Sequence, residues 1–135
     1  MGKKKYTRGM RNNNPLNIRI GNEWMGEVRN PTDREFEQFE APVWGVRAAM
    51  KLIKRYINRY GLNTLTDIIN RWAPRSENDT NNYIAFVSRV SGVLPNERLR
   101  WDDQRKMFAI IKAMAVIESD WNLDDELLEE AYRMA

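Results

Sequence analysis

The sequence has 135 residues, of which 42% are hydrophobic and 30% charged, and it carries a formal net charge of +3. This is the composition of a globular chain that can bury its own core, and it excludes a disordered protein. The absence of cysteine and histidine excludes disulfides, thiolate- or histidine-bound metals and histidine-based triads. We therefore expect no metal and no cofactor, and any catalysis must use carboxylates, Lys, Tyr, Ser or Thr.

Charge is spread unevenly along the chain. Residues 1–11 carry five basic side chains and no acid, whereas residues 118–135 carry seven acids against Arg133 alone. We expect residues 1–11 to form a basic, flexible arm, and such an arm could bind an anionic polymer or a membrane surface. It serves equally well as a solubilising tail, and the pattern leaves both interpretations open.

No apolar run is long enough to span a membrane, and no apolar stretch follows the basic start as it would in a secretory signal. We therefore expect a protein without a membrane span that is made in the cytoplasm and kept there until it is released or carried elsewhere.

The first forty residues are rich in Asn, Gly and Pro and contain short β-prone pieces. These pieces lie at Asn17–Ile20, Glu23–Val28 and Glu35–Phe39. They predict a loop-rich lobe with a small β-hairpin.

The remainder of the chain shows helical periodicity with recognisable start and stop residues. We expect five helices. The first begins at Pro42 and is closed by Gly61, the second runs from Thr64 to Trp72, and the third contains Tyr83 to Val90 and ends at Gly92. The fourth runs from Asp102 to Glu118, and the fifth begins at Asp124. Asp79 and Glu77 are candidate caps for the helix that contains Tyr83. The pattern predicts a mainly α, single domain over 1–135, a bundle of about five helices with a small N-terminal β-hairpin lobe.

Glu118 ends the most apolar of these helices and continues its stripe of Met107, Ile111 and Met114. Apolar neighbours, the negative end of the helix dipole and Asp120 all favour a protonated carboxyl there. Such an acid can protonate a glycosidic oxygen. The alternative is a helix-end glutamate turned towards solvent.

The segment A-V-I-E-S-D-W-N, residues 115–122, resembles the first motif of the lytic transglycosylase and goose-type lysozyme superfamily. In this resemblance Glu118 matches the catalytic acid, and Leu123 replaces the usual proline. The segment E-N-D-T-N-N-Y-I-A-F-V, residues 77–87, is similar to the tyrosine motif of the same superfamily. That likeness implies that Tyr83 assists the acid, while its spacing fits a core aromatic equally well.

The stretch R-G-M-R-N-N-N-P-L-N-I-R, residues 8–19, together with W-G-V-R-A at 44–48 and N-T-L-T-D-I-I-N-R-W-A-P at 63–74, resembles phage virion structural proteins and lysins. Residues 14–19 are also similar to a stretch that follows the catalytic glutamate in flagellar and autolysin-type glucosaminidases. Glu118 here follows these motifs instead of preceding them. The resemblance therefore implies a lysozyme-like fold in circularly permuted order.

Amides and aromatic rings suit a sugar polymer. The expected substrate-binding residues are Asn12, Asn13, Asn14, Asn17 and Trp24, although Asn-rich stretches also form turns and tryptophans are usually core. A second carboxylate would be Asp33 or Glu27.

The resemblance implies a muramidase or lytic transglycosylase of phage type that cleaves bacterial peptidoglycan. The enzyme would be a monomer, and its catalytic residues would be Glu118, Tyr83 and Asp33. It would be made in the host cytoplasm and act, with or without packaging in a virion, in the periplasm or on the cell wall. The alternative is a non-catalytic virion structural or wall-binding protein, with other virion proteins as partners. Nucleic-acid binding through residues 1–11 is a third possibility that no motif supports, and we expect no nucleic-acid partner.

Overall fold

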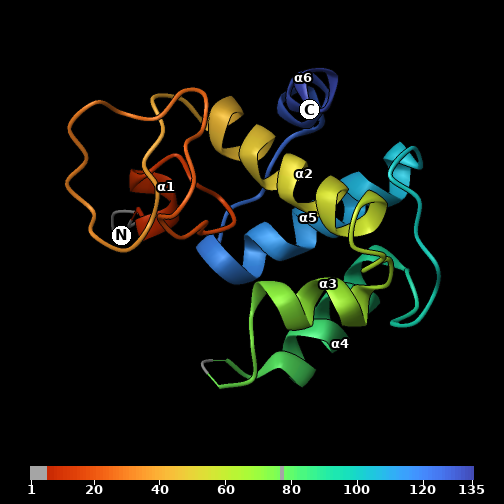
Figure 1. Ribbon diagram of the computed structural model, residues 1–135. Helices are drawn as coiled ribbons and strands as arrows, with labels where there is room; N and C mark the ends of the chain where they lie inside the picture. The colour runs from red at the N-terminus through yellow and green to blue at the C-terminus, as the bar shows by residue number, and fades with distance from the viewer. Residues whose placement is uncertain (1–5, 77) are drawn as a thin grey trace, which may run out of the picture. The chain divides into compact units, whose positions relative to one another are not determined.

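The computed structural model describes residues 6–76 and 78–135, and this part of the chain is mainly helical (Figure 1). Its helices are α1 (Arg8–Arg11), α2 (Pro42–Asn58), α3 (Leu65–Trp72), α4 (Thr80–Ser91), α5 (Gln104–Ser119) and α6 (Asp125–Met134). The mainly α prediction is confirmed. None of the helices in the described ranges is both long enough and apolar enough to cross a bilayer.

Three helices begin where the sequence places a capping side chain. Thr64 accepts a hydrogen bond from Asp67 N (3.1 Å), Asp79 from Asn82 N (3.2 Å) and Asp124 from Leu127 N (2.8 Å). Each cap satisfies a backbone N–H that has no partner within its own helix. The expected starts of α3, α4 and α6 are therefore confirmed, while Glu77 lies outside the described residues.

The chain divides into two compact units, one made of residues 1–50 and 115–135 and the other of residues 51–114. We call them unit 1 and unit 2. Helices α2 and α5 each run through both units, and in unit 2 α3 and α4 lie side by side (Figure 1). Unit 1 thus joins the two ends of the chain. The single domain over 1–135 stays a prediction.

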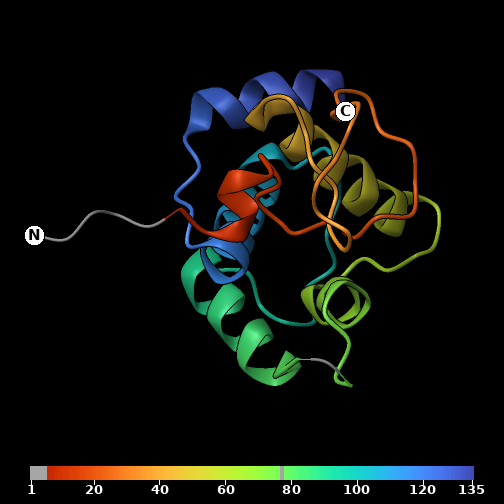
Figure 2. The ribbon, with the colours of Figure 1, turned by 90° about the vertical axis from the view of Figure 1, so that its left-hand side faces the viewer.

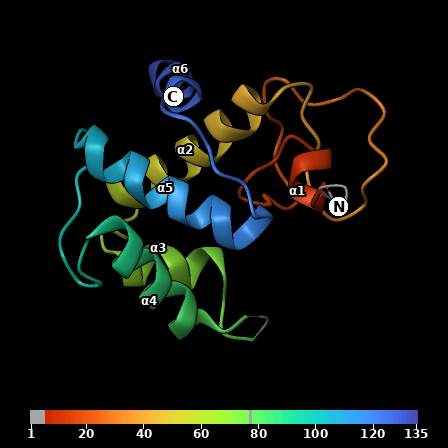
Figure 3. The same ribbon diagram turned by 180° about the vertical axis from the view of Figure 1, so that it is seen from behind.

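The expected N-terminal β-hairpin is not present in the described residues. Two isolated antiparallel bridges, Arg19↔Phe36 and Glu27↔Phe39, take its place, and the segment between α1 and α2 is drawn without strands (Figures 1 and 3). The reason is that side chains bind backbone groups which a hairpin would pair with each other. Asp33 Oδ1 accepts from the N–H groups of residues 35 and 36, and the Gln38 side chain accepts from those of residues 32 and 33.

The last four residues of the expected flexible arm over 1–11 are helical. Arg8–Arg11 form the short helix α1, whose N-cap Thr7 accepts from Met10 N. Figure 2 shows α1 against the C-terminal turn of α5, where the Thr7 hydroxyl donates to Ser119 O (2.7 Å). The basic side chains Lys3, Lys4 and Lys5 lie outside the described residues.

Candidate functional site

Glu118 stands one residue before the end of α5, on a helix whose apolar stripe is buried as the sequence predicts. Met107, Ile111 and Met114 are 1%, 0% and 0% exposed, whereas Glu118 is half-buried. The helix stops because Asp120 adopts a left-handed backbone with φ of 50°. The sharp turn leaves the Glu118 carboxyl at the boundary between core and solvent.

Asn17 lies against Glu118 although 101 residues separate them in the sequence. Its Nδ2 donates to Glu118 O at 2.8 Å and to Glu118 Oε1 at 3.3 Å. The loop presents this side chain through a left-handed residue, φ 51°, a conformation that asparagine tolerates better than most residues. The structure therefore brings together two of the residues that the sequence selects, an amide donor and a carboxyl group.

Ser119 joins the same turn of α5 to the N-terminal segment. Its side chain is 1% exposed, and its hydroxyl donates to Pro15 O at 2.8 Å. Gly9 of α1 packs so closely that a Cβ there would lie 1.8 Å from Ser119 Oγ. Through these contacts the loop that carries Asn17 keeps a fixed position beside Glu118.

Three of the four asparagines expected to bind substrate are engaged within unit 1. Asn12 donates to Asp33 Oδ2 (2.9 Å) and Asn13 to Phe39 O (2.9 Å). Asn14, which is fully buried, donates to Ile18 O and to Glu37 O and accepts from Ile18 N. These contacts favour a structural role for Asn12, Asn13 and Asn14.

Asp33 is the centre of a polar network. Arg8 donates to both of its carboxylate oxygens, at 2.7 and 2.8 Å, and Asn12 adds a third side-chain donor. The Arg8 guanidinium, helped by these hydrogen bonds, holds the pKa of Asp33 well below its usual range. With its side chain only 8% exposed and its lone pairs occupied, Asp33 is better suited to hold the loop than to act as a base.

The Arg8 guanidinium also lies over a ring. Arg8 Cζ is 4.6 Å from the centroid of Phe36, and Arg19 Cζ is 5.1 Å from the same centroid. Glu35 forms ion pairs with both arginines, at 3.1 and 3.6 Å. The basic side chains at 8 and 19 therefore stabilise the loop around Phe36.

Trp24 and Tyr83 lie in different units. Trp24, in unit 1, is half-buried, and its indole Nε1 is buried with no hydrogen-bond partner among the described residues. Tyr83, in unit 2, is 6% exposed on the face of α4 that also buries Ile84 and Val87. The assisting role of Tyr83 and the sugar-binding role of Trp24 stay predictions.

A buried acid that the sequence reasoning missed lies in the same loop. Glu37 is 5% exposed, and its carboxyl lies near that of Glu27. Burial and the nearby Glu27 carboxylate raise the pKa of Glu37 to about 8. One signal could have revealed it. In an extended segment residues 37 and 39 point to the same face, and Phe39 is 2% exposed.

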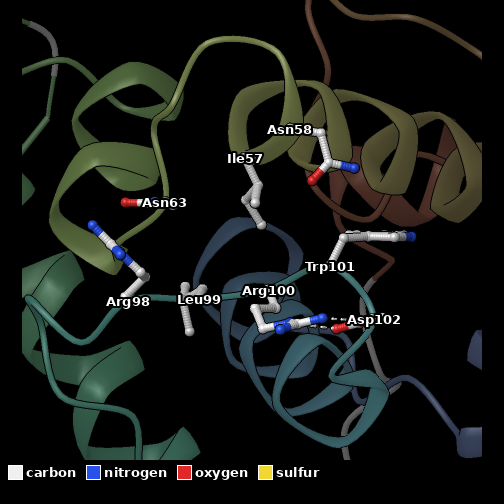
Figure 4. Close-up of a pocket in the computed structure, with 8 residues that line it drawn as sticks. All are labelled: Ile57, Asn58, Asn63, Arg98, Leu99, Arg100, Trp101 and Asp102. Atoms are coloured by element: carbon white, nitrogen blue, oxygen red, sulfur yellow. Dashed lines mark hydrogen bonds and ion pairs between the residues drawn. The ribbon is translucent and has the colours of Figure 1, made fainter.

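Unit 2 contains a groove of about 400 Å³ at the end of α2 (Figure 4). Its apolar lining includes Ile57, Leu99 and Trp101, each less than 10% exposed. Arg98 and Arg100 lie along it, and Arg100 is paired with Asp102 at 2.9 Å. None of the site residues predicted from the sequence lines this groove.

Comparison with known proteins gives the chain a family. No protein-family model matches it, and the lysozyme-like resemblance, which rests on short motifs, stays a prediction. The chain is similar to protein P5 of Pseudoalteromonas phage PM2, with 43% identity over 119 residues. The alignment covers 85% of this chain and 72% of the phage protein. The chain therefore belongs to the family of protein P5 of phage PM2.

Proposed function

We propose that this chain is a structural component of a phage particle, a virion protein that does not cleave glycan strands. Its membership in a phage protein family supports the phage setting. Partners in the particle would be other virion proteins, and no enzymatic step is required of the chain in this role.

The observation that carries the proposal is the internal use of the polar side chains in unit 1. Asn12, Asn13, Asn14 and Asp33, half of the eight residues selected for a sugar site, bind other parts of the same loop. A substrate could not take these groups without breaking hydrogen bonds that hold the loop together. Their arrangement supports a rigid building block.

The proposal is tested by asking where the protein goes in an infected culture. Particles of the phage that encodes the chain are purified on a density gradient and probed with an antibody raised against it. We expect the chain to band with the particles in a constant ratio to the other virion proteins. Its presence only in the unbound fraction of the lysate would contradict a structural role.

A second candidate function, cleavage of peptidoglycan glycan strands, is favoured by the Asn17–Glu118 contact. A glutamic acid that an amide holds in place at the edge of the core is suited to present a proton to a glycosidic oxygen. With Asp33 engaged by Arg8, the remaining candidate for a second carboxylate is Glu27. A lytic transglycosylase would need Glu118 alone.

The second candidate is tested with Glu118→Gln, which keeps the shape of the side chain and removes the acid. Glu129→Gln, on the exposed face of α6, is the matched control. Glycan cleavage by this site requires that the wild type and the control release fragments from purified peptidoglycan and that Glu118→Gln does not. Equal release by all three proteins would exclude Glu118 as the acid.

A further inference from the structure

The groove at the end of α2 in unit 2 takes no part in either proposed function. Ile57, Leu99 and Trp101 give it a buried apolar lining. Arg98 and Arg100, which precede and follow Leu99, also line the groove and are exposed (Figure 4). An apolar lining beside cationic side chains suits a ligand that combines carboxylates with an apolar side chain.

Arg98 is the cation of this lining that the chain itself does not neutralise. It forms no ion pair with any residue in the described ranges. The acids of the neighbouring segment are each paired with a cation, Asp102 with Arg100 and both Glu97 and Asp103 with Lys106. The stretches 51–66 and 95–106, which supply all the lining residues, together carry eight basic side chains and three acids. The groove therefore has an excess of positive charge.

Helix α6 in unit 1 presents the complementary chemistry. Its inner face buries Leu128 and Ala131. On its outer face Glu126, Glu130 and Met134 follow one another at four-residue spacing, and all three are exposed. The two glutamates form no ion pair within the part of the chain that the structure describes. Helical geometry thus places two unpaired carboxylates and a flexible apolar side chain in one stripe.

The spacing of the charges on the two surfaces also matches. Residues four apart in a helix are separated by about 6 Å along its axis, which applies to Glu126 and Glu130. Residues two apart in an extended segment are separated by about 6.6 Å. Arg98 and Arg100 alternate with a buried residue, the pattern of a locally extended chain. Two ion pairs can therefore form at once, with Met134 directed to the apolar lining.

We propose that the groove binds helix α6 of a second copy of this chain, with Glu126 and Glu130 against Arg98 and Arg100. The choice of occupant follows from charge. Unit 2 carries twelve basic side chains against six acids, whereas unit 1 carries thirteen acids against ten basic side chains. Because a groove and a helix are different surfaces, the contact is head-to-tail, and a pair of copies keeps one groove and one α6 for further copies. The inference deepens the proposed structural role and rests on it for its setting in the particle.

The association is expected to be weak and sensitive to salt. Ion pairs that stay partly in solvent each contribute little and are screened by added ions. Arg100 has to leave Asp102, but that pair is 78% and 69% exposed, so the exchange costs little. Association should therefore grow with protein concentration at low salt. The monomer expected from the sequence resemblance is then the species of dilute or high-salt solution.

The test measures the average mass of the full-length protein by sedimentation at increasing concentration, in about 0.05 M and about 1 M salt. We expect the wild-type mass to rise with concentration at the lower salt and to stay at that of one chain at the higher salt. The groove variant Arg98→Gln/Arg100→Gln and the helix variant Glu126→Gln/Glu130→Gln should each remain single chains at both. All four side chains are exposed, so these substitutions leave the core intact.

An equimolar mixture of the two variants tests the head-to-tail geometry. The helix variant supplies an intact groove and the groove variant an intact α6, whereas the other groove and the other helix have lost their charges. The mixture should therefore form dimers and nothing larger. The matched controls, Arg29→Gln/Arg75→Gln and Glu23→Gln/Glu40→Gln, remove equal charges at exposed positions outside both surfaces, and they should associate like the wild type.

A wild type that stays a single chain at every concentration in low salt overturns the proposal and leaves the groove to some other ligand. Variants that associate as well as the wild type overturn it too, as does a mixture that stays monomeric or grows beyond dimers. The presence of the chain in purified particles is measured separately. A failure of self-association can therefore be distinguished from a failure of the proposed structural role.

Discussion

Gly9 and Ser119, 110 positions apart in the chain, are in such close contact that no side chain fits between them. A Cβ on Gly9 would lie 1.8 Å from Ser119 Oγ, 2.7 Å from Ser119 Cβ and 3.0 Å from Asn14 O. Helix α1 and the end of α5 meet at this point, and the contact keeps the Asn-rich loop beside the end of α5.

Gly9→Ala should therefore destabilise the protein. The added methyl group has to displace a buried side chain that is itself hydrogen-bonded to Pro15 O, and overpacking of this kind costs about 1–3 kcal/mol. Chemical denaturation measures the loss. The matched control is Gly21→Ala in the same unit, where nothing lies within 4 Å of the new Cβ. Equal stability of both variants would show that the contact is not tight in solution.

Asn14→Ala should be among the most damaging polar substitutions in unit 1. It removes two donor contacts and one acceptor contact at a fully buried position, and backbone groups left unpaired in a core cost about 1–3 kcal/mol each. We expect a loss of at least about 2 kcal/mol in the free energy of unfolding. Asn30→Ala, at an exposed position, should change it by less than about 0.5 kcal/mol. Similar losses in both variants would contradict the structural role.

The sequence predicts those parts of the fold that depend on local signals. Thr64, Asp79 and Asp124 identify helix starts because a capping side chain acts within three residues of itself. The role of Asn14 could not be predicted from the sequence. No local pattern distinguishes an asparagine that binds the backbone of Ile18 and Glu37 from one that forms a turn or contacts a sugar.

Asp33→Asn should lower stability at neutral pH by on the order of 2 kcal/mol, because the hydrogen bonds from Arg8 lose their charged acceptor. The pKa of Asp33 is lowered in the folded state. Its contribution is therefore present above the unfolded value of about 4 and is lost as pH falls below it.

The measurement is unfolding as a function of pH between 2 and 7 for the wild type and Asp33→Asn. The two curves should converge as the solution becomes acidic. Asp102→Asn serves as the control, since its pair with Arg100 is exposed on both sides and the substitution should change the profile much less than Asp33→Asn does. A constant difference between the wild type and Asp33→Asn at every pH would argue against the depressed pKa.

The candidate site could be predicted only in part, because one of its two residues follows from a local pattern and the contact between them does not. The stripe of α5 gives the position of Glu118 directly, because helical periodicity places it. Its contact with Asn17 depends on how two segments 101 residues apart pack, and no local pattern encodes that packing. Glu37 was missed because an acid between Phe36 and Phe39 is ordinarily expected to face solvent.

The central proposal, a structural role without glycan cleavage, is tested most directly by incubating the purified protein with peptidoglycan and analysing the soluble products by mass spectrometry. We predict no released glycan fragments across pH 5 to 8, and no difference between the wild type and Glu118→Gln. Fragments with anhydro or reducing ends that appear with the wild type and disappear with Glu118→Gln would contradict the proposal and establish the enzyme.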